Sequence, residues 1–343
     1  MANGRALLAR LALFACLAIG AYSQRGGGAL ALTYDAQTRG PVPIPPSERG
    51  LQTVIAEPWF KVSQNRMVLE GPCFDRNGNL LFSDASGGHV LRLSRDKQLS
   101  TLLSENNLGP GGLAIHKDGR IFITSLGDLK GAGSIIAIKP DGSGMQTIVP
   151  PRAGYLPNDL VFDARGGFYF SDFRGISTDP KGGVYYVSPD FKTITPVLPH
   201  FAMANGIALS PSGGELWATE FSRNLLHRVE LAGPTEIATI GSAIPYQFIG
   251  PAPDSMRTDS DGNVYVAMYG QGRVLVFNTN GIPIGQVLLP DRDAGHNLES
   301  TSMAIKPGTN DLYIVTNDGN GGGGAMIFHA QAFAKALPLY SHQ

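Results

Sequence analysis

From Leu51 onward, short runs of apolar and aromatic residues alternate with polar turns that contain Gly, Asn or Asp. Runs of about four to eight such residues, bounded by turn residues, are typical of β-strands. No stretch of this region keeps the apolar spacing of a helix for more than about two turns. The pattern therefore predicts a body that is nearly all β-structure.

One phrase recurs six times in this body: an apolar strand, a polar turn that contains a Gly, and a second apolar-aromatic strand. The copies are CFDRNGNLLFSD, AIHKDGRIFITS, VFDARGGFYFSD, ALSPSGGELWAT, RTDSDGNVYVAM and AIKPGTNDLYIV, with turn glycines Gly78, Gly119, Gly166, Gly213, Gly262 and Gly308. The glycines lie roughly 40 to 50 residues apart, and repeats of this length with about four strands each indicate propeller blades. Since single blades cannot bury their own faces, the six units predict one six-bladed β-propeller domain.

The propeller is assigned to residues 51–335, followed by a C-terminal tail at 336–343. Residues 51–63, LQTVIAEPWFKVS, have the pattern of a lead-in strand. We expect this strand to pair with the last blade and close the ring, with an exposed surface arm as the alternative. The preceding residues 24–50 are rich in Gly and Pro and are interpreted as an extended lead-in.

The N-terminus has the features of a secretory signal peptide. Arg5 and Arg10 precede an apolar run, and small residues at 21–23 offer a cleavage point, so residues 1–23 are assigned as the signal. The run is shorter than the roughly 20 apolar residues that a membrane span requires. We expect export to the periplasm or outside the cell. A lipoprotein is disfavoured because the bulky Phe14 lies close before Cys16.

The net charge and the cysteine content limit the classes of function that fit this sequence. The formal net charge is -1, and Lys and Arg are scattered, so no basic surface for nucleic acid is expected. Removal of the signal leaves Cys73 as the only cysteine, which excludes an internal disulfide. A small molecule is the expected partner.

Oxygen-bearing side chains stand eight residues before four of the six turn glycines: Glu70, Asn158, Asn205 and Asp254. The innermost strand of each blade lines the central channel of a propeller, so equivalent positions should meet at one end of that channel. Two carboxylates there repel each other unless a cation or a proton lies between them. Oxygen donors without His or Cys favour Ca²⁺, with Ser255 as a further ligand, over Zn²⁺. The alternative is that each is an ordinary polar residue near a turn.

Other polar motifs carry weaker signals. The segment DSDGN at 259–263 coincides with a repeat turn and lacks the pattern of a calcium-binding loop. Cys73 is interpreted as a small core residue, because no basic residue stands beside it. Four side chains are expected to contact substrate because they lie near the ring in sequence: Tyr246, Phe248, Tyr269 and His296.

Five segments of the predicted propeller carry a resemblance to a known family: LEGPCFDRNGNLLFSD, PNDLVFDARGGFYFSDFRG, PKGGVYYVSPDF, MANGIALSPSG and APDSMRTDSDGNVYVAMYGQGRVLVFN. They resemble the gluconolactonase, regucalcin and senescence-marker-protein family, and most of all its drug-responsive bacterial lactonase branch. The resemblance covers roughly residues 51–333. It implies a six-bladed propeller with a catalytic divalent cation, usually calcium, that hydrolyses lactone esters.

The family's metal ligands fall on Glu70, Asn158, Asn205 and Asp254, with Ser255 as a fifth, as the resemblance implies. In the lactonase branch the position of Asn158 is often Asp, and an amide there lowers the charge of the site. The branch also carries a structural calcium near the segments that match 131–133 and 150–155. Pro150 stands here at an acidic position, and Gly131 and Ala153 stand at hydroxyl-bearing positions, which weighs against that second ion.

The sequence therefore predicts a metal-dependent lactonase in which Asp254 activates water, with Ca²⁺ as the expected cofactor and Mg²⁺, Mn²⁺ or Zn²⁺ as alternatives. Three other functions stay open. A cation that polarises a carbonyl can also serve an aryl-esterase or a phosphotriesterase. The repeat can form a non-catalytic ligand-binding propeller. A strictosidine-synthase-like propeller would not need the ring of carboxylates and amides.

Overall fold

The computed structural model of the protein describes residues 34, 38, 40–129 and 131–342. The predicted signal peptide and most of residues 24–39 lie outside the described residues. Within the described part of the chain, no helix is long and apolar enough to cross a membrane. All strands belong to one compact unit, residues 40–343, and that unit is described below.

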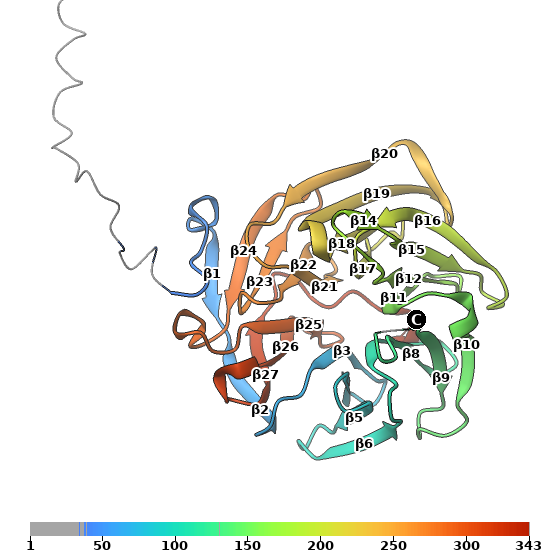
Figure 1. Cartoon of the computed structure of the whole chain (residues 1–343), viewed down its shortest axis with the longest axis horizontal. Coiled ribbons are helices and arrows are strands. Elements are labelled where there is room, and N and C mark those ends of the chain that lie inside the picture. The colour runs from blue at the N-terminus through green and yellow to red at the C-terminus, as the bar shows by residue number, and fades with distance from the viewer. Residues whose placement is uncertain (1–33, 35–37, 39, 130, 343) are drawn as a thin grey trace, which may run out of the picture. The chain divides into compact units, whose positions relative to one another are not determined.

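Six β-sheets stand around a central channel and form a six-bladed β-propeller, which confirms the predicted fold class (Figure 1). Each blade begins with its innermost strand. Blades 1 to 3 comprise β3 (Leu69–Phe74), β4 (Leu80–Asp84), β5 (His89–Leu93) and β6 (Leu99–Ser104); β7 (Pro110–Ile115), β8 (Ile121–Ser125), β9 (Ser134–Ile138) and β10 (Gln146–Val149); and β11 (Pro157–Phe162), β12 (Phe168–Asp172), β15 (Gly182–Val187) and β16 (Ile194–Phe201).

Blades 4 to 6 follow the same order. They comprise β17 (Ala204–Leu209), β18 (Glu215–Glu220), β19 (Leu225–Gly233) and β20 (Glu236–Gln247); β21 (Pro253–Thr258), β22 (Val264–Met268), β23 (Arg273–Phe277) and β24 (Pro283–Leu288); and β25 (Glu299–Ile305), β26 (Asp311–Asn317) and β27 (Ala325–Gln331). The remaining elements are a small hairpin of β13 (Gly175–Ile176) and β14 (Asp179–Pro180) and the 3-10 turns Pro46–Glu48, Pro151–Ala153, Phe221–Arg223, Arg292–Ala294, Gly319–Gly321 and Tyr340–His342.

The repeated turn glycines join the first and second strands of the blades. In blade 1, the amide of Gly78 donates to the carbonyl of Asp75 at 2.9 Å, and Gly78 has a φ of 77°. Glycine adopts this left-handed backbone without the steric cost that a Cβ brings. The turn therefore requires the glycine on which the repeat was recognised.

The core lies between neighbouring blades rather than within them. One cluster joins Leu81 of blade 1 to Ile123 of blade 2, and another joins Trp217 of blade 4 to Phe277 of blade 5. Full burial of such side chains contributes about 1.5 to 3 kcal/mol each. Because every blade buries its faces on its neighbours, the ring must be complete to be stable.

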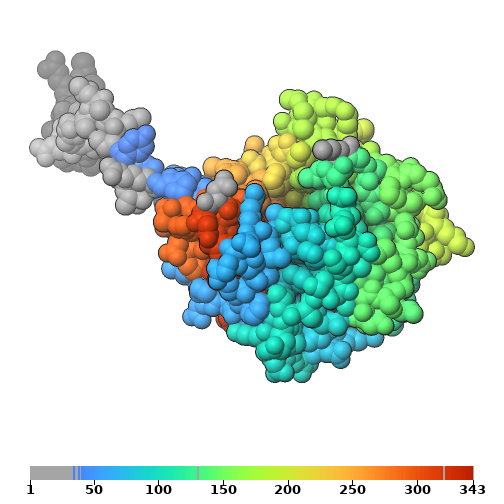
Figure 2. Space-filling view, turned by 60° about the horizontal axis from the view of Figure 1, so that its bottom comes forward, coloured from blue at the N-terminus to red at the C-terminus, as the bar shows by residue number. Residues whose placement is uncertain are grey.

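The lead-in residues close the ring. Strand β2 (Glu57–Ser63) pairs antiparallel with β27 as the outermost strand of blade 6, and β1 (Gln52–Ile55) pairs in parallel with β24 of blade 5. In Figure 2 the blue N-terminal strands lie against the orange and red final blades. The closing strand predicted for residues 51–63 is thus present in blade 6 only over residues 57–63, because residues 52–55 pair with blade 5 instead.

A chain that begins at Gln64 should melt at least about 10 °C lower than one that begins at Gly40, because the shorter chain lacks the packing of Trp59 and Phe60 on blade 6. Calorimetry on both chains measures the difference. Equal melting temperatures would show that the closing strand adds no stability.

The last residues of the chain pack across the channel on the turn side of the propeller. The amide of Ser260 donates to the carbonyl of Lys335, and the amide of Ala336 donates to the carbonyl of Thr309, both at 2.8 Å. At the far end, Arg76 Nε donates to the carbonyl of Ser341 at 2.6 Å. The segment that was expected to be a simple tail therefore spans from blades 5 and 6 to blade 1.

Candidate metal centre

The second residue of each innermost strand forms a ring at one end of the channel. In chain order the six positions are Glu70, Gly111, Asn158, Asn205, Asp254 and Ser300. The four residues predicted to bind metal thus occupy equivalent places on β3, β11, β17 and β21. The pairing of every innermost strand with its neighbour shifts register at or just after this place. Such bulges bend a strand and re-aim its side chains.

Glycines beside the ring allow the innermost strands to approach one another. A Cβ added to Gly206 would lie 2.5 Å from the carbonyl oxygen of Asp254, and one added to Gly71 would lie 2.5 Å from that of Gly111. Real side chains do not tolerate such distances, so these positions require glycine for close backbone contact. The narrow packing brings ring residues from separate blades together.

The two ring carboxylates, Glu70 and Asp254, are buried and interact with each other. Burial, followed by the charges of Asp254 and Asp159, raises the pKa of Glu70 well above its ordinary value. Burial also raises the pKa of Asp254, although hydrogen bonds from Asn205 and from the backbone of Ser255 oppose that rise. The site therefore concentrates negative charge where water is scarce, a condition that a cation relieves.

Two oxygen atoms of the ring lack a hydrogen-bond donor. Asn205 Oδ1 and Asp254 Oδ1 are both buried without a partner among the described residues. Buried polar atoms are nearly always satisfied in folded proteins, so unpaired oxygens that share a site with a carboxylate pair fit a hard cation. No cluster of three or more His, Cys, Asp or Glu side chains suited to metal occurs in the part of the chain that the structure describes. The ring donors are instead two carboxylates and two amides.

Ser255, the remaining predicted ligand, follows Asp254 on β21 and is 1% exposed. Its backbone N–H favours the charged form of the Asp254 carboxylate and so acts to lower the pKa of Asp254. Ser255 is thus buried next to a ring residue, and its role as a metal ligand stays a prediction.

Hydroxyl groups on the second strands brace the ring, a feature that the sequence reasoning missed. Ser83 Oγ donates to the carbonyl of Gly111 at 2.8 Å, and Thr219 Oγ1 donates to that of Asp254, also at 2.8 Å. Thr124 Oγ1 likewise donates to the carbonyl of Asn158 at 2.6 Å. Each hydroxyl reaches into the next blade. The available signal was the Ser or Thr near the end of the second strand in the repeated phrases.

A buried ion pair next to the ring was also missed. Asp159, fully buried beside Asn158, accepts a hydrogen bond from Arg257 Nη1 at 3.0 Å. Arg257 lies three residues after Asp254, so the pair links blades 3 and 5 across the channel. It adds one negative and one positive charge close to the two ring carboxylates.

Two of the predicted substrate contacts lie on loops at the ring end of the channel. Burial, then the charges of Glu299 and Asp254, raises the pKa of Tyr269, which places this phenol within the influence of the ring. His296 Nδ1 lies 3.0 Å from Asp318 Oδ2, and its side chain is 45% exposed. Both residues are therefore available to a ligand at that end.

The other two aromatic residues belong to packed surroundings. Tyr246 donates a hydrogen bond to Glu48 and contacts Phe277 with ring centroids 5.0 Å apart, while Phe248 lies 5.7 Å from the same ring. Their substrate role stays a prediction. Cys73 lies in the core between blades 1 and 2, where burial raises its pKa to about 12 and keeps the thiol protonated.

The two segments suggested for a second calcium lie together in the structure. The amide of Gly133 donates to the carbonyl of Tyr155 at 2.7 Å, and a 3-10 turn, Pro151–Ala153, follows Pro150. The doubt about a second ion, drawn from Pro150, Gly131 and Ala153, stays a prediction.

The family described as "SMP-30/Gluconolactonase/LRE-like region" matches residues 68–318 of this chain. The chain belongs to this family. The prediction made from its sequence strings is thereby confirmed. A protein named "Lactonase drp35" from Staphylococcus saprophyticus is 50% identical over 314 residues, which cover 90% of this chain and 97% of that protein. The protein of the same name from Staphylococcus aureus is 47% identical over 316 residues, 91% and 97% of the two chains. The predicted enzyme class, a carboxylic ester hydrolase, is that of these relatives.

Solved structures agree with the fold. A calcium-binding protein, regucalcin, from Agrobacterium tumefaciens aligns with a TM-score of 0.69 at 18% identity, covering 84% of this chain and 99% of that chain. A gluconolactonase from Xanthomonas campestris aligns with a TM-score of 0.65 at 18% identity, covering 82% and 96%. At this identity the similarity establishes the propeller architecture.

Proposed function

We propose that this protein is a divalent-metal-dependent lactonase that uses Ca²⁺. The observation that carries the proposal is the buried ring in which Glu70 and Asp254 interact while two ring oxygens lack a donor among the described residues. The names of the Staphylococcus relatives support the substrate class, and the similarity to regucalcin, a calcium-binding protein, supports calcium. Mg²⁺, Mn²⁺ and Zn²⁺ are the alternative ions.

Glu70, Asn158, Asn205 and Asp254 would hold the ion, with Ser255 at its edge. A bound divalent cation supplies a Lewis acid that polarises the ester carbonyl and stabilises negative charge on its oxygen. Carboxylate and amide oxygens match the preference of Ca²⁺ for oxygen ligands.

Asp254 is assigned as the general base. Its carboxylate would take the proton of an attacking water and then return that proton to the leaving alkoxide. Asn205 and the backbone of Ser255 favour the charged form of this carboxylate, because both act to lower its pKa. Tyr269 and His296 are assigned to substrate positioning, because they border the same end of the channel.

Removal of the metal should abolish hydrolysis of lactones. Purified protein is analysed for its metal content and then assayed with a panel of lactones, aryl esters and phosphotriesters, with and without chelator. We expect lactones to be the best substrates and Ca²⁺ to restore the activity of the chelated protein. Faster turnover of phosphotriesters or aryl esters would replace the proposed substrate class. Full activity of the metal-free protein would refute the role of the ring.

A further inference from the structure

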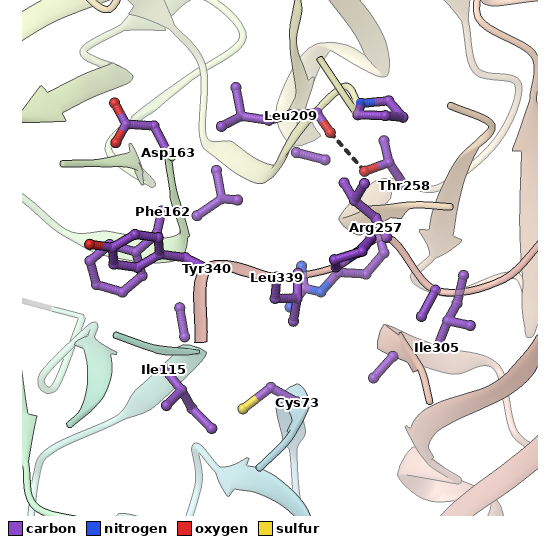
Figure 3. A pocket seen from close by; sticks show the side chains of 18 of the residues that line it. Cys73, Ile115, Phe162, Asp163, Leu209, Arg257, Thr258, Ile305, Leu339 and Tyr340 are labelled. Atoms are coloured by element: carbon purple, nitrogen blue, oxygen red, sulfur yellow. Dashed lines mark hydrogen bonds between the residues drawn. The ribbon is translucent and has the colours of Figure 1, made fainter. Parts of the chain in front are cut away.

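A cavity of about 160 Å³ lies at the other end of the channel from the ring. Its walls come from the last residues of the innermost strands, among them Ile115, Phe162, Leu209 and Ile305 (Figure 3). These positions follow the ring residues by four to five places, which corresponds to about 13 to 17 Å along a strand. The lining also includes Pro72, Leu160 and Ile207, each two residues after a ring position, so the cavity extends along the channel from the turn end, but no ring residue belongs to its described lining.

The lining is mostly apolar, and its two charged side chains differ in whether they are free to bind a ligand. Asp163 is the only carboxylate among the described lining residues, and it is occupied by its own turn, where it accepts bonds from the backbone of Arg165 and Gly167 and from the hydroxyl of Tyr186. Within the same described lining, Arg257 is the only cation. An apolar chamber with one positive group suits a small ligand with an apolar body and one anionic end.

The guanidinium of Arg257 is only partly used. Nη1 donates to Asp159 Oδ2 at 3.0 Å and to the carbonyl of Met256 at 2.6 Å. Its Nε and Nη2 groups make no hydrogen bond to the described residues, and the side chain is 18% exposed. The unused edge carries the parallel N–H donors that arginine offers to a carboxylate.

The C-terminal segment forms the roof of the cavity. Residues 336–340 belong to its lining, and Tyr340 stacks on Phe162 with ring centroids 5.5 Å apart. In Figure 3 the C-terminal ribbon crosses between the blades and carries Leu339 and Tyr340. The segment is anchored on both sides, through Ala336 and Ser341. Leu339 lies between the anchors and is 38% exposed, so the roof has an open edge toward solvent.

We propose that this cavity is a second small-molecule site, which binds a short apolar monocarboxylate with its carboxylate on Arg257 and its carbon chain among Ile115, Leu209, Ile305 and Leu339. A cavity of about 150 Å³ accepts benzene in another protein, so a chain of similar size fits here. The proposal rests on the proposed function for its charge balance. With a divalent cation bound at the ring, the charges of the ion and of Glu70, Asp254, Asp159 and Arg257 add up to zero. A carboxylate that binds in the cavity is therefore not repelled by a net negative charge.

The test uses hexanoate as the probe, with the full mature protein loaded with Ca²⁺, and measures binding by calorimetry and ligand-observed NMR. Hexanoate should bind at least tenfold more tightly than hexanamide. Ile115→Phe should abolish binding by filling the cavity, and Arg257→Lys should weaken it at least tenfold while keeping a charge next to Asp159. Ile240→Phe, at a side chain that is 97% exposed on blade 4, is the matched control and should bind like the wild type.

Two results would overturn the proposal: equal binding of hexanoate and hexanamide, or hexanoate binding that survives Ile115→Phe. Binding that survives in this variant but disappears with chelator would locate the carboxylate on the metal instead. Lactonase activity is measured on the same samples. If Ile115→Phe loses hexanoate binding but keeps full lactonase activity, this second site is distinct from the lactonase site. If the wild type binds hexanoate but does not hydrolyse lactones, only the proposed lactonase function is refuted.

Discussion

Asp254→Asn should lower kcat/KM for lactone hydrolysis by about 100- to 10,000-fold, the usual loss for a general acid-base group. The amide has nearly the shape of the carboxylate but cannot accept the proton of the attacking water. The fold should persist, because the substitution removes one of two buried carboxylates whose proximity is unfavourable without a cation. Steady-state kinetics and a melting curve on the same preparation measure both effects.

Asp261→Asn is the matched control for this variant. Asp261 lies in the exposed turn of the same blade, so its loss should leave the rate unchanged. Calcium binding by Asp254→Asn must also be measured, since a weaker site lowers activity for a second reason. If Asp254→Asn retains the full rate at saturating Ca²⁺, the base lies elsewhere.

Glu48→Ala should destabilise the propeller by about 3 to 5 kcal/mol, because it leaves Arg273 as an uncompensated buried charge. Glu48 Oε2 lies 2.5 Å from Arg273 Nη1, and the two side chains are 1% and 0% exposed. Glu48 also accepts a hydrogen bond from Tyr246. The pair attaches the lead-in segment to blade 5, and denaturant unfolding measures its contribution.

A double variant, Glu48→Met with Arg273→Met, distinguishes the loss of attraction from the burial of a lone charge. It should be more stable than Glu48→Ala, since neither partner then remains charged and alone. Lactonase activity at low temperature should be close to wild type in both variants, because neither residue belongs to the ring. A single variant as stable as the wild type would show that the ion pair does not hold the segment.

The candidate ring could be located from the sequence because its members share one offset from the turn glycines. Glu70, Asn158, Asn205 and Asp254 are second residues of their strands, and circular repetition converts equal sequence positions into one place in space. The substrate contacts, which were inferred from proximity in sequence, stay predictions. Tyr246 and Phe248 precede Asp254 by a few residues and pack on Phe277 between blades 4 and 5.

Contacts that bridge blades could not be read from spacing. The pairing of Arg257 with Asp159 joins residues that are 98 positions apart and lie on different blades. No local pattern encodes such distances, because they depend on how far each blade is rotated and how closely the inner strands pack. The position of residues 336–342 across the channel likewise depends on partners in blades 1, 5 and 6.

By itself, then, the sequence determined the six repeats, their turns and the equivalent strand positions of the four oxygen donors, since each of these follows from local periodicity. Only the tertiary structure decided that the channel has two chemically different ends. The ring end gathers buried carboxylates and amides, and the turn end is an apolar chamber with Arg257, roofed by the C-terminal segment. The physical reason is that side chains of distant residues are brought together by packing between blades and not by strand pairing within a blade. This packing determines which side chains are buried together and which N–H donors stay without an acceptor.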